Sequence, residues 1–430
     1  MHSLTVNGIH ILGALIGFLL IYRLSVPGRF SQLLWPVTAL WGAVMALFIF
    51  FNTHPLLFAD FRDCYWLAGH LIWQGPQALM GAYDAENPIF VNIPIVAYLF
   101  APFGLMPDLT AALVFTGIGV IAVLYTWRKL TELYSLDRRE SALLFLALCI
   151  FGPMLYSFRE ANTSHMILAA LVAGIALTRE RKDLTAGIVF GVCAVIKPAL
   201  LLIGVFYFLR GRWNVVIGGA AVVVTSALLS LLIFGWDMHV FWYESSIAPF
   251  TQHPVPAYSN QTLQAMLARF EIGGPAGHNY SIHELSALSN MIDKLLTVLL
   301  VGGALFAVWR SGRMLRATDR DIEIELMMIV TLGLMVSALS WAHYYVWLFP
   351  GAVFLWAQSR PGQALERLRW PMLAGFALAS GIAFISHSMT LGRFGPFANI
   401  VASHWLWGAM IILGLPAIAR AQKSAPATAA

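Results

Sequence analysis

The feature that most constrains this chain is a series of long apolar segments separated by short basic loops. A helix needs about 20 apolar residues to cross a hydrocarbon core of about 30 Å, and about eleven segments approach that length. They lie near 6–22, 33–51, 109–127, 141–157, 164–178, 214–234, 290–309, 325–341, 343–358, 371–387 and 399–419. Only 11% of the residues are charged, against about 25% in soluble domains. The pattern predicts an all-α polytopic membrane protein.

Lysine and arginine predict the topology, because these residues concentrate in cytoplasmic loops. The clusters assigned to the cytoplasm are Arg23 and Arg29; Arg128, Lys129, Arg138 and Arg139; Arg179, Arg181 and Lys182; Arg210 and Arg212; Arg310, Arg313, Arg316 and Arg320; Arg360, Arg367 and Arg369; and Arg420 with Lys423. Two long loops, 52–90 and 235–289, then lie on the outer side. Topology explains the net charge of +5, and no basic stripe with interleaved aromatic residues indicates nucleic acid binding.

Two further apolar stretches would bring the number of helices to between eleven and thirteen. Prolines interrupt 91–106, so this stretch is either a half-helix that re-enters the membrane or a short crossing. The stretch 184–208 has basic clusters at both ends and Lys197-Pro198 in its middle. Each of its arms is too short to cross a bilayer. We expect a broken hairpin with Lys197 at its deep tip.

Asp60, Arg62, Asp63 and Tyr65 follow the second apolar segment closely. A carboxylate at the outer end of a span is well placed to act as a general base or to hold an acceptor hydroxyl. The alternative is a solvated loop in which Asp60 caps an amphipathic helix over 61–73. Asp60 and Asp63 could also hold a divalent cation, and the sequence indicates no other cofactor.

Lys197 is the second candidate. An ammonium group within a bilayer costs about 2.5–3.5 kcal/mol on insertion scales and usually marks a ligand or a counter-ion. Snorkelling to the membrane surface is the alternative, but Lys197 is about equally far from both ends of its hairpin. An anionic headgroup such as a phosphate would be a natural partner.

Three other motifs carry weaker signals. Arg159 and Asn162 lie between two spans on the outer side, where Arg159 and its neighbour Glu160 also suit a local salt bridge. Asn260 lies in a loop whose amides and hydroxyls suit sugar hydroxyls as well as ordinary turns. His343 lies at an outer span end, where it could bind phosphate, relay a proton or be structural.

The sequence carries no motif of soluble nucleotide chemistry. It contains no P-loop, no glycine-rich dinucleotide motif after a strand, no zinc-protease motif and no nucleophile elbow. Cys64, Cys149 and Cys193 stand far apart without the spacing of a zinc site or a disulfide framework.

The order of these pieces resembles glycosyltransferase family 87, of the GT-C class of enzymes that use polyprenyl-phosphate sugars. The resemblance covers about residues 33–360. It rests on Asp60-Phe61, Ala101-Pro102, the glycine-containing hairpin with Lys197, the loop with Asn260, and Ser340-Trp341-x-His343.

The family assignment implies a domain order and a GT-C-like bundle with long outer loops that carry short amphipathic helices. Residues 1–32 would add an N-terminal span and a cytoplasmic loop. A catalytic membrane core would follow over 33–360, further spans over 361–420, and a disordered cytoplasmic tail over 421–430.

The resemblance assigns the family's leading carboxylate to Asp60, its aromatic continuation to Tyr65, its hairpin lysine to Lys197 and its late histidine to His343. Where many relatives have Gly-Gln-x-Asn, only Asn162 carries over.

A second departure concerns the segment 92–94. Asn-Ile-Pro stands there in place of a typical Tyr-Pro-Pro, which leaves the donor and acceptor type undecided.

The implied activity is transfer of a hexose, mannose-like, or a pentose from a polyprenyl-phosphate donor to a glycan or lipid acceptor of the cell envelope. It would occur on the periplasmic or extracytoplasmic face of a bacterial inner membrane, with inversion at the anomeric carbon. Asp60 would be the base, and Lys197 with His343 or Arg62 would neutralise the phosphate. The other substrate-binding candidates are Asp63, Tyr65, Arg159, Asn162 and Asn260.

The alternative activity is transport of a lipid or polysaccharide, because broken helices and a buried lysine also suit a substrate path. Geometry separates the two readings. An enzyme should bring Asp60, Lys197 and His343 toward one outward cavity, and wide separation of Asp60 from Lys197 would remove the catalytic assignment.

Overall fold

A computed structural model describes residues 2–52, 57–83, 90–273, 279–311, 317–363, 365–380 and 392–421. Within these ranges the chain forms helices and loops, with a single isolated bridge between Asn260 and Trp341. The prediction of an all-α membrane protein is confirmed. Almost all of the predicted tail, the outer part of the span near 371–387, and Arg313 and Arg316 lie outside the described residues.

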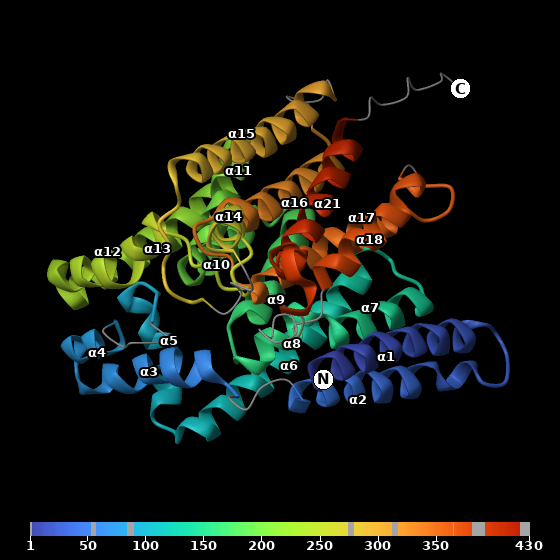
Figure 1. The fold of residues 1–430 in the computed structure, drawn as a ribbon, viewed down its shortest axis with the longest axis horizontal. Coiled ribbons are helices and arrows are strands. Elements are labelled where there is room, and N and C mark those ends of the chain that lie inside the picture. The colour runs from blue at the N-terminus through green and yellow to red at the C-terminus, as the bar shows by residue number, and fades with distance from the viewer. Residues whose placement is uncertain are drawn as a thin grey trace. The chain divides into compact units, whose positions relative to one another are not determined.

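The described residues fall into two compact units, an N-terminal unit up to Gln252 and a C-terminal unit from His253 onward. Six helices among them are long and apolar enough to cross a membrane. These six correspond to α1 (His2–Ser25), α2 (Leu34–Asn52), α6 (Asp108–Leu133), α12 (Trp213–Trp242), α15 (Ala287–Arg310) and α21 (His404–Ala421). The helices α1 and α2 lie side by side (Figure 1).

The remaining predicted spans are bent, short or charged at one end. The apolar stretch 141–157 was expected to be one crossing, but α7 (Arg138–Ile150) and α8 (Gly152–Arg159) meet at an angle of 49°. Pro153 explains the break, because it lacks the amide hydrogen that a continuing helix needs. Shorter helices are α9 (Ser164–Arg179), α17 (Phe349–Gln358) and α18 (Arg369–Ser380). The helix α16 (Asp319–Val336) is as long as α21, but its first two turns carry several charged residues.

The broken hairpin over 184–208 is confirmed. One arm is α10 (Asp183–Ile196), and the other consists of η6 (Pro198–Leu200) and α11 (Leu201–Leu209). Arg212, just beyond the second arm, donates from Nε to the carboxylate of Asp183 at 3.0 Å. Since the start of one arm and the end of the other meet, Lys197 lies at the opposite tip.

The stretch 91–106 contains η5 (Pro94–Val96) and α5 (Ala97–Gly104). Eleven helical residues with a rise of about 1.5 Å each cannot cross a core of about 30 Å. Of the two interpretations, the half-helix fits.

The predicted cytoplasmic loops of the N-terminal unit meet at one end of it. Arg138 donates to the carbonyl of Ser31 at 2.9 Å, and Arg179 donates to the carbonyl of Leu133 at 2.5 Å. Arg212 donates to the carbonyl of Thr178 at 3.1 Å. Each bond joins two different basic loops or their helix ends, so the charge pattern correctly grouped them.

The described part of the loop 52–90 folds into short helical pieces, as predicted for an outer loop. They are the π-helix η2 (Asp60–Trp66), α3 (Leu67–Leu71), η3 (Ile72–Gln74), η4 (Pro76–Leu79) and α4 (Met80–Tyr83). The next long loop contains η7 (Tyr243–Ile247), α13 (Ala248–Gln252) and α14 (Leu263–Ile272).

Arg420, assigned from the sequence to a cytoplasmic basic cluster, lies near the end of α21 in the C-terminal unit. Its side chain is fully buried, and Nε donates to Glu325 Oε1 at 2.7 Å. It also donates to the hydroxyl of Ser311. A buried guanidinium needs such partners, and here they join the ends of α15 and α21 to α16.

Candidate active site

The π-helix η2 brings Asp60 to the side of the helix that Tyr65 occupies. A π-helix forms hydrogen bonds between residues five apart, so residues with this spacing lie above one another. Two backbone bonds hold its start: Phe58 N donates to Arg159 O at 2.7 Å, and Phe61 N donates to Glu160 O at 3.1 Å. The segment at 159–160 therefore fixes the position of Asp60.

Asp60 does not cap a helix, so the alternative interpretation of this residue is wrong. Ala59 occupies the N-cap, no side chain caps that end, and the expected helix over 61–73 is divided among η2, α3 and η3. The carboxyl group of Asp60 instead faces the segment after α8.

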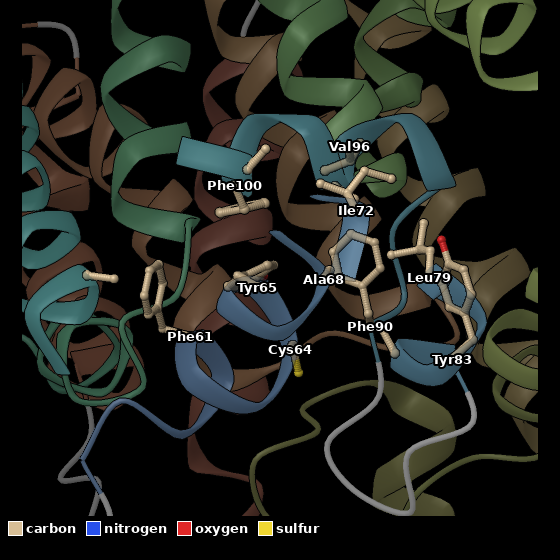
Figure 2. Packing of buried hydrophobic residues seen from close by; sticks show 14 of the residues in the cluster. Phe61, Cys64, Tyr65, Ala68, Ile72, Leu79, Tyr83, Phe90, Val96 and Phe100 are labelled. Carbon is tan, nitrogen blue, oxygen red and sulfur yellow. The ribbon is translucent and has the colours of Figure 1, made fainter. Parts of the chain in front are cut away.

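An aromatic cluster supports the inner face of η2. Figure 2 shows Phe61, Tyr65, Phe90 and Phe100 in this cluster. The Tyr65 ring stacks on Phe100 with centroids 4.6 Å apart and meets the edge of Phe90 at 6.4 Å. Such ring pairs stabilise by about 0.5–1.5 kcal/mol beyond burial, and they fix the direction of the Tyr65 hydroxyl.

Glycine allows the cluster to close. A Cβ atom on Gly69 of α3 would lie 2.2 Å from the carbonyl oxygen of Phe100 in α5. Only glycine permits this backbone approach, which keeps Phe100 against Tyr65.

Asn162 holds the Asp60 carboxylate. Its Nδ2 donates to Asp60 Oδ2 at 2.8 Å and to the Tyr65 hydroxyl at 3.3 Å. Its Oδ1 accepts from the backbone N and the hydroxyl of Ser164 at 3.1 and 2.8 Å. Because Ser164 occupies the oxygen, the amide nitrogen must face the carboxylate.

Lys197 reaches the same group from the hairpin tip. The residue is only 4% exposed, and its Nζ donates to the Tyr65 hydroxyl at 3.4 Å. The backbone leaves the helical conformation there, with φ −133° and ψ 89°. Snorkelling is therefore not what this side chain does, and Lys197 lies close enough for its positive charge to favour the ionised form of Asp60.

Arg159 and Glu160 form a buried ion pair next to this group. Arg159 Nε donates to Glu160 Oε1 at 3.1 Å, and its guanidinium lies 4.4 Å from the centre of the Tyr156 ring. The salt bridge expected of Arg159 and Glu160 therefore exists, and it lies beside the candidate base Asp60.

The surroundings raise the pKa of Asp60 to about 7. Loss of solvent around the carboxyl group is the largest cause, and the negative charge of Glu160 adds to it. The hydrogen bond from Asn162 and the charges of Lys197 and Arg159 act in the opposite direction. A general base is most effective when its pKa lies near the working pH.

Two predicted residues lie outside this group. Arg62 is about half exposed and pairs with Asp108 at the start of α6, with Nε and Oδ2 2.6 Å apart. Asp63 is exposed. Within the described ranges, no three His, Cys, Asp or Glu side chains converge as a metal site would require.

In the C-terminal unit, Asn260 serves the fold. It is fully buried, its Nδ2 donates to Val255 O at 3.0 Å, and its Oδ1 accepts from Ser340 N at 3.1 Å. The turn interpretation of this residue is confirmed, and both ends of its amide are engaged within the chain.

His343 lies in η9 (Ala342–Leu348) and is 3% exposed. Its ring meets Tyr344 edge to face at 4.9 Å. The predicted convergence of His343 with Asp60 stays a prediction, because the two residues belong to different units.

Sequence reasoning missed two contributors. Arg269 received no role from the sequence, yet it is fully buried and organises the loop around Asn260. Asn92 was noted only as a departure from the family pattern, yet its Nδ2 donates to the carbonyl of Ile196 at 2.6 Å, next to Lys197. The departure from the family pattern at 92–94 was the sequence signal that could have drawn attention to Asn92.

Comparison with known proteins identifies the family of this chain. The model of glycosyltransferase family 87 matches residues 90–338, which is more than half of the chain. The chain is 27% identical over 328 residues, 74% of each chain, to a polyprenol-phosphate-mannose-dependent alpha-(1-2)-phosphatidylinositol pentamannoside mannosyltransferase of Mycolicibacterium smegmatis.

A protein of the same description from Mycobacterium tuberculosis is 24% identical over 334 residues, 73% of this chain and 71% of its own. No solved structure matches. The resemblance seen in the order of motifs is thus confirmed, and the chain belongs to glycosyltransferase family 87 as a multi-pass membrane glycosyltransferase.

Proposed function

We propose that this protein transfers a mannose-like sugar from a polyprenyl-phosphate donor to a hydroxyl of a glycan or lipid acceptor. The names of the relatives support this donor and a glycolipid acceptor. The observation that carries the proposal is the Asp60 carboxylate, held by Asn162 and facing the positive charge of Lys197.

The reaction mainly requires the protein to position the two substrates, accept a proton and stabilise the charge on the departing phosphate. The acceptor oxygen forms a bond to the anomeric carbon while the bond from that carbon to the phosphate oxygen breaks. The departing phosphate keeps the bonding electrons, and the acceptor hydroxyl loses its proton. A single displacement of this kind inverts the anomeric centre.

Asp60 takes the acceptor proton in this proposal, because a pKa of about 7 lets the carboxylate be present at neutral pH and still accept a proton. Lys197 stabilises the charge that develops on the phosphate. A cation placed in advance in a poorly solvated site stabilises such charge strongly.

The other candidates take supporting parts. Asn162, Tyr65 and Arg159 hold or polarise the Asp60 carboxylate and the Lys197 ammonium group. Arg62 and Asp63 lie at the exposed side, where they would contact only outer parts of a substrate.

His343 is proposed as a second contact for the phosphate. Asn260 would act indirectly, by holding the segment at 340 that leads to His343.

We place the reaction on the extracytoplasmic face of a bacterial inner membrane. The basic loops support this side, because α9 starts beside Asn162 and ends at Arg179 among those loops. Its 16 residues correspond to about 24 Å, close to the thickness of a hydrocarbon core. If the basic loops are cytoplasmic, Asp60 lies on the outer side.

The test is to incubate the purified protein in lipid nanodiscs with a membrane lipid extract and radiolabelled donors. Polyprenyl-phosphate mannose should label a product, whereas a nucleotide-linked mannose should not. Magnetic resonance of the product should show the inverted anomer. Labelling from the nucleotide sugar, or none from any polyprenyl-phosphate sugar, would overturn the proposal.

A sealed-vesicle version tests the side of the membrane. Right-side-out vesicles should transfer to an impermeant acceptor added outside, and inverted vesicles should not. The reverse pattern would place the site on the cytoplasmic face.

A further inference from the structure

Asn92 lies at the tip of the Lys197 hairpin, although it belongs to a segment about a hundred residues earlier in the chain. Its Nδ2 donates to Ile196 O at 2.6 Å, and its own carbonyl accepts from the Tyr83 hydroxyl at 2.9 Å. The Ile196 carbonyl can only accept, so the orientation of the Asn92 amide is determined.

This orientation leaves the amide oxygen unused. Asn92 is only 4% exposed, and its Oδ1 has no hydrogen-bond partner among the residues that the structure describes. Buried polar atoms in folded proteins are nearly always hydrogen-bonded, and an exception calls for an explanation. The oxygen is an acceptor, so the missing partner is a donor.

Bonded neighbours place Asn92 at the candidate active site from two directions. The residue it binds, Ile196, directly precedes Lys197. Phe90, two residues before Asn92, packs perpendicular to the Tyr65 ring, and the Tyr65 hydroxyl accepts from Lys197. The unused oxygen therefore lies in the part of the unit where the reacting groups gather.

We propose that Asn92 Oδ1 binds a hydroxyl group of a sugar in the active site, and that this contact contributes to specificity. The inference rests on the proposed function. An amide oxygen is neutral and accepts one or two hydrogen bonds, which suits a sugar hydroxyl. A substrate that lacks this hydroxyl would leave the buried oxygen unpaired, and a site built in this way rejects such an analogue.

The hydroxyl belongs either to the transferred sugar or to the acceptor, and substrate analogues distinguish the two. The donor series is farnesyl-phosphate mannose with single hydroxyls removed at positions 2, 3, 4 and 6. The acceptor series is octyl mannoside with the same changes at every position except the hydroxyl that receives the sugar. For each analogue, kcat/KM is compared with that of the parent compound in wild type and in Asn92→Ala.

We expect one analogue to lose about tenfold with wild type, the effect of one hydrogen bond, and to lose nothing further with Asn92→Ala. The series that contains this analogue identifies the sugar. A general disturbance of the hairpin would lower activity with every substrate and leave the ratio between parent and analogue unchanged. Unchanged ratios throughout both series would overturn the proposal.

Two further variants keep the result interpretable. Tyr83→Phe removes the hydroxyl that holds the Asn92 carbonyl, and it should leave every ratio as in wild type. If Asn92→Ala does not fold, Asn92→Ser serves in its place, because it keeps a donor for Ile196 O and removes the amide oxygen. With Asn92→Ser the parent compound and that one analogue should have equal kcat/KM. Absence of transfer by wild type itself would contradict the proposed function and not this assignment.

Discussion

Two groups of polar side chains, one in each unit, differ in what their members bind. In the N-terminal unit, Asp60, Asn162 and Lys197 are directed toward one another or toward the Tyr65 hydroxyl. In the C-terminal unit, Arg269 directs Nη1 at the backbone carbonyls of Pro256, Ala257 and Asn260, at 3.1, 3.0 and 2.9 Å.

The difference separates a reaction site from a structural centre. Carbonyl groups of a folded loop cannot change their charge or their partner during a reaction, so Arg269 is committed to holding that loop. Side chains that bind one another can rotate and exchange hydrogen-bond partners when a substrate enters. Burial and charge alone do not make an active site.

The largest effect on activity should follow from Lys197→Met, because it removes the cation proposed for the departing phosphate. Loss of one preorganised charge-stabilising group costs about 10²–10³ in kcat. The thermal midpoint in detergent should not fall, since a buried charge is replaced by an apolar side chain. Near-normal kcat in this variant would assign the phosphate to other residues.

Arg269→Met should show the opposite pattern. It leaves several buried carbonyls unpaired and should destabilise the C-terminal unit by about 3 kcal/mol. Differential scanning fluorimetry and the yield of folded protein measure this loss. Activity per folded molecule should stay within about threefold of wild type, and a stable but inactive variant would show that Arg269 acts in the reaction.

Asn162→Ala tests how the N-terminal group tunes its carboxylate. The hydrogen bond from Asn162 lowers the pKa of Asp60, so its removal should raise that pKa further. The base works when deprotonated, hence kcat should rise with pH through about 7 in wild type and through a higher pH in the variant. At neutral pH we expect about tenfold less activity. Superimposable pH profiles would show that Asn162 does not tune the base.

Arg62→Gln should have the smallest effect. The ion pair of Arg62 with Asp108 is exposed, and exposed pairs contribute about 0–1 kcal/mol. We expect kcat to change by less than about twofold and the donor KM to rise by less than about fivefold. A loss comparable with that of Lys197→Met would place Arg62 in the phosphate site.

The sequence indicated those features that depend on local pattern. Apolar length and basic loops predicted the membrane helices, and Lys197-Pro198 between two short arms predicted the broken hairpin. The family resemblance predicted that Asp60 and Lys197 belong to one active site. The structure brings Asp60, Tyr65, Arg159, Asn162 and Lys197 together.

What escaped prediction depends on contacts between distant segments. Arg62 looked like a phosphate ligand until α6 brought Asp108 to it. The sequence allowed Asn260 to bind sugar hydroxyls, but in the structure its Oδ1 accepts from Ser340 N. The π-helical register that aligns Asp60 with Tyr65 has no pattern of its own in the sequence.

Single-turnover transfer by Asp60→Asn tests the central claim most directly. The variant keeps the size of the side chain and removes the base, and general bases contribute about 10²–10⁴ in rate. With preformed donor complex at pH 7.5 and protein shown to be folded, we predict a loss in that range with donor affinity retained. Transfer within about threefold of wild type would contradict the assignment of Asp60 as the base.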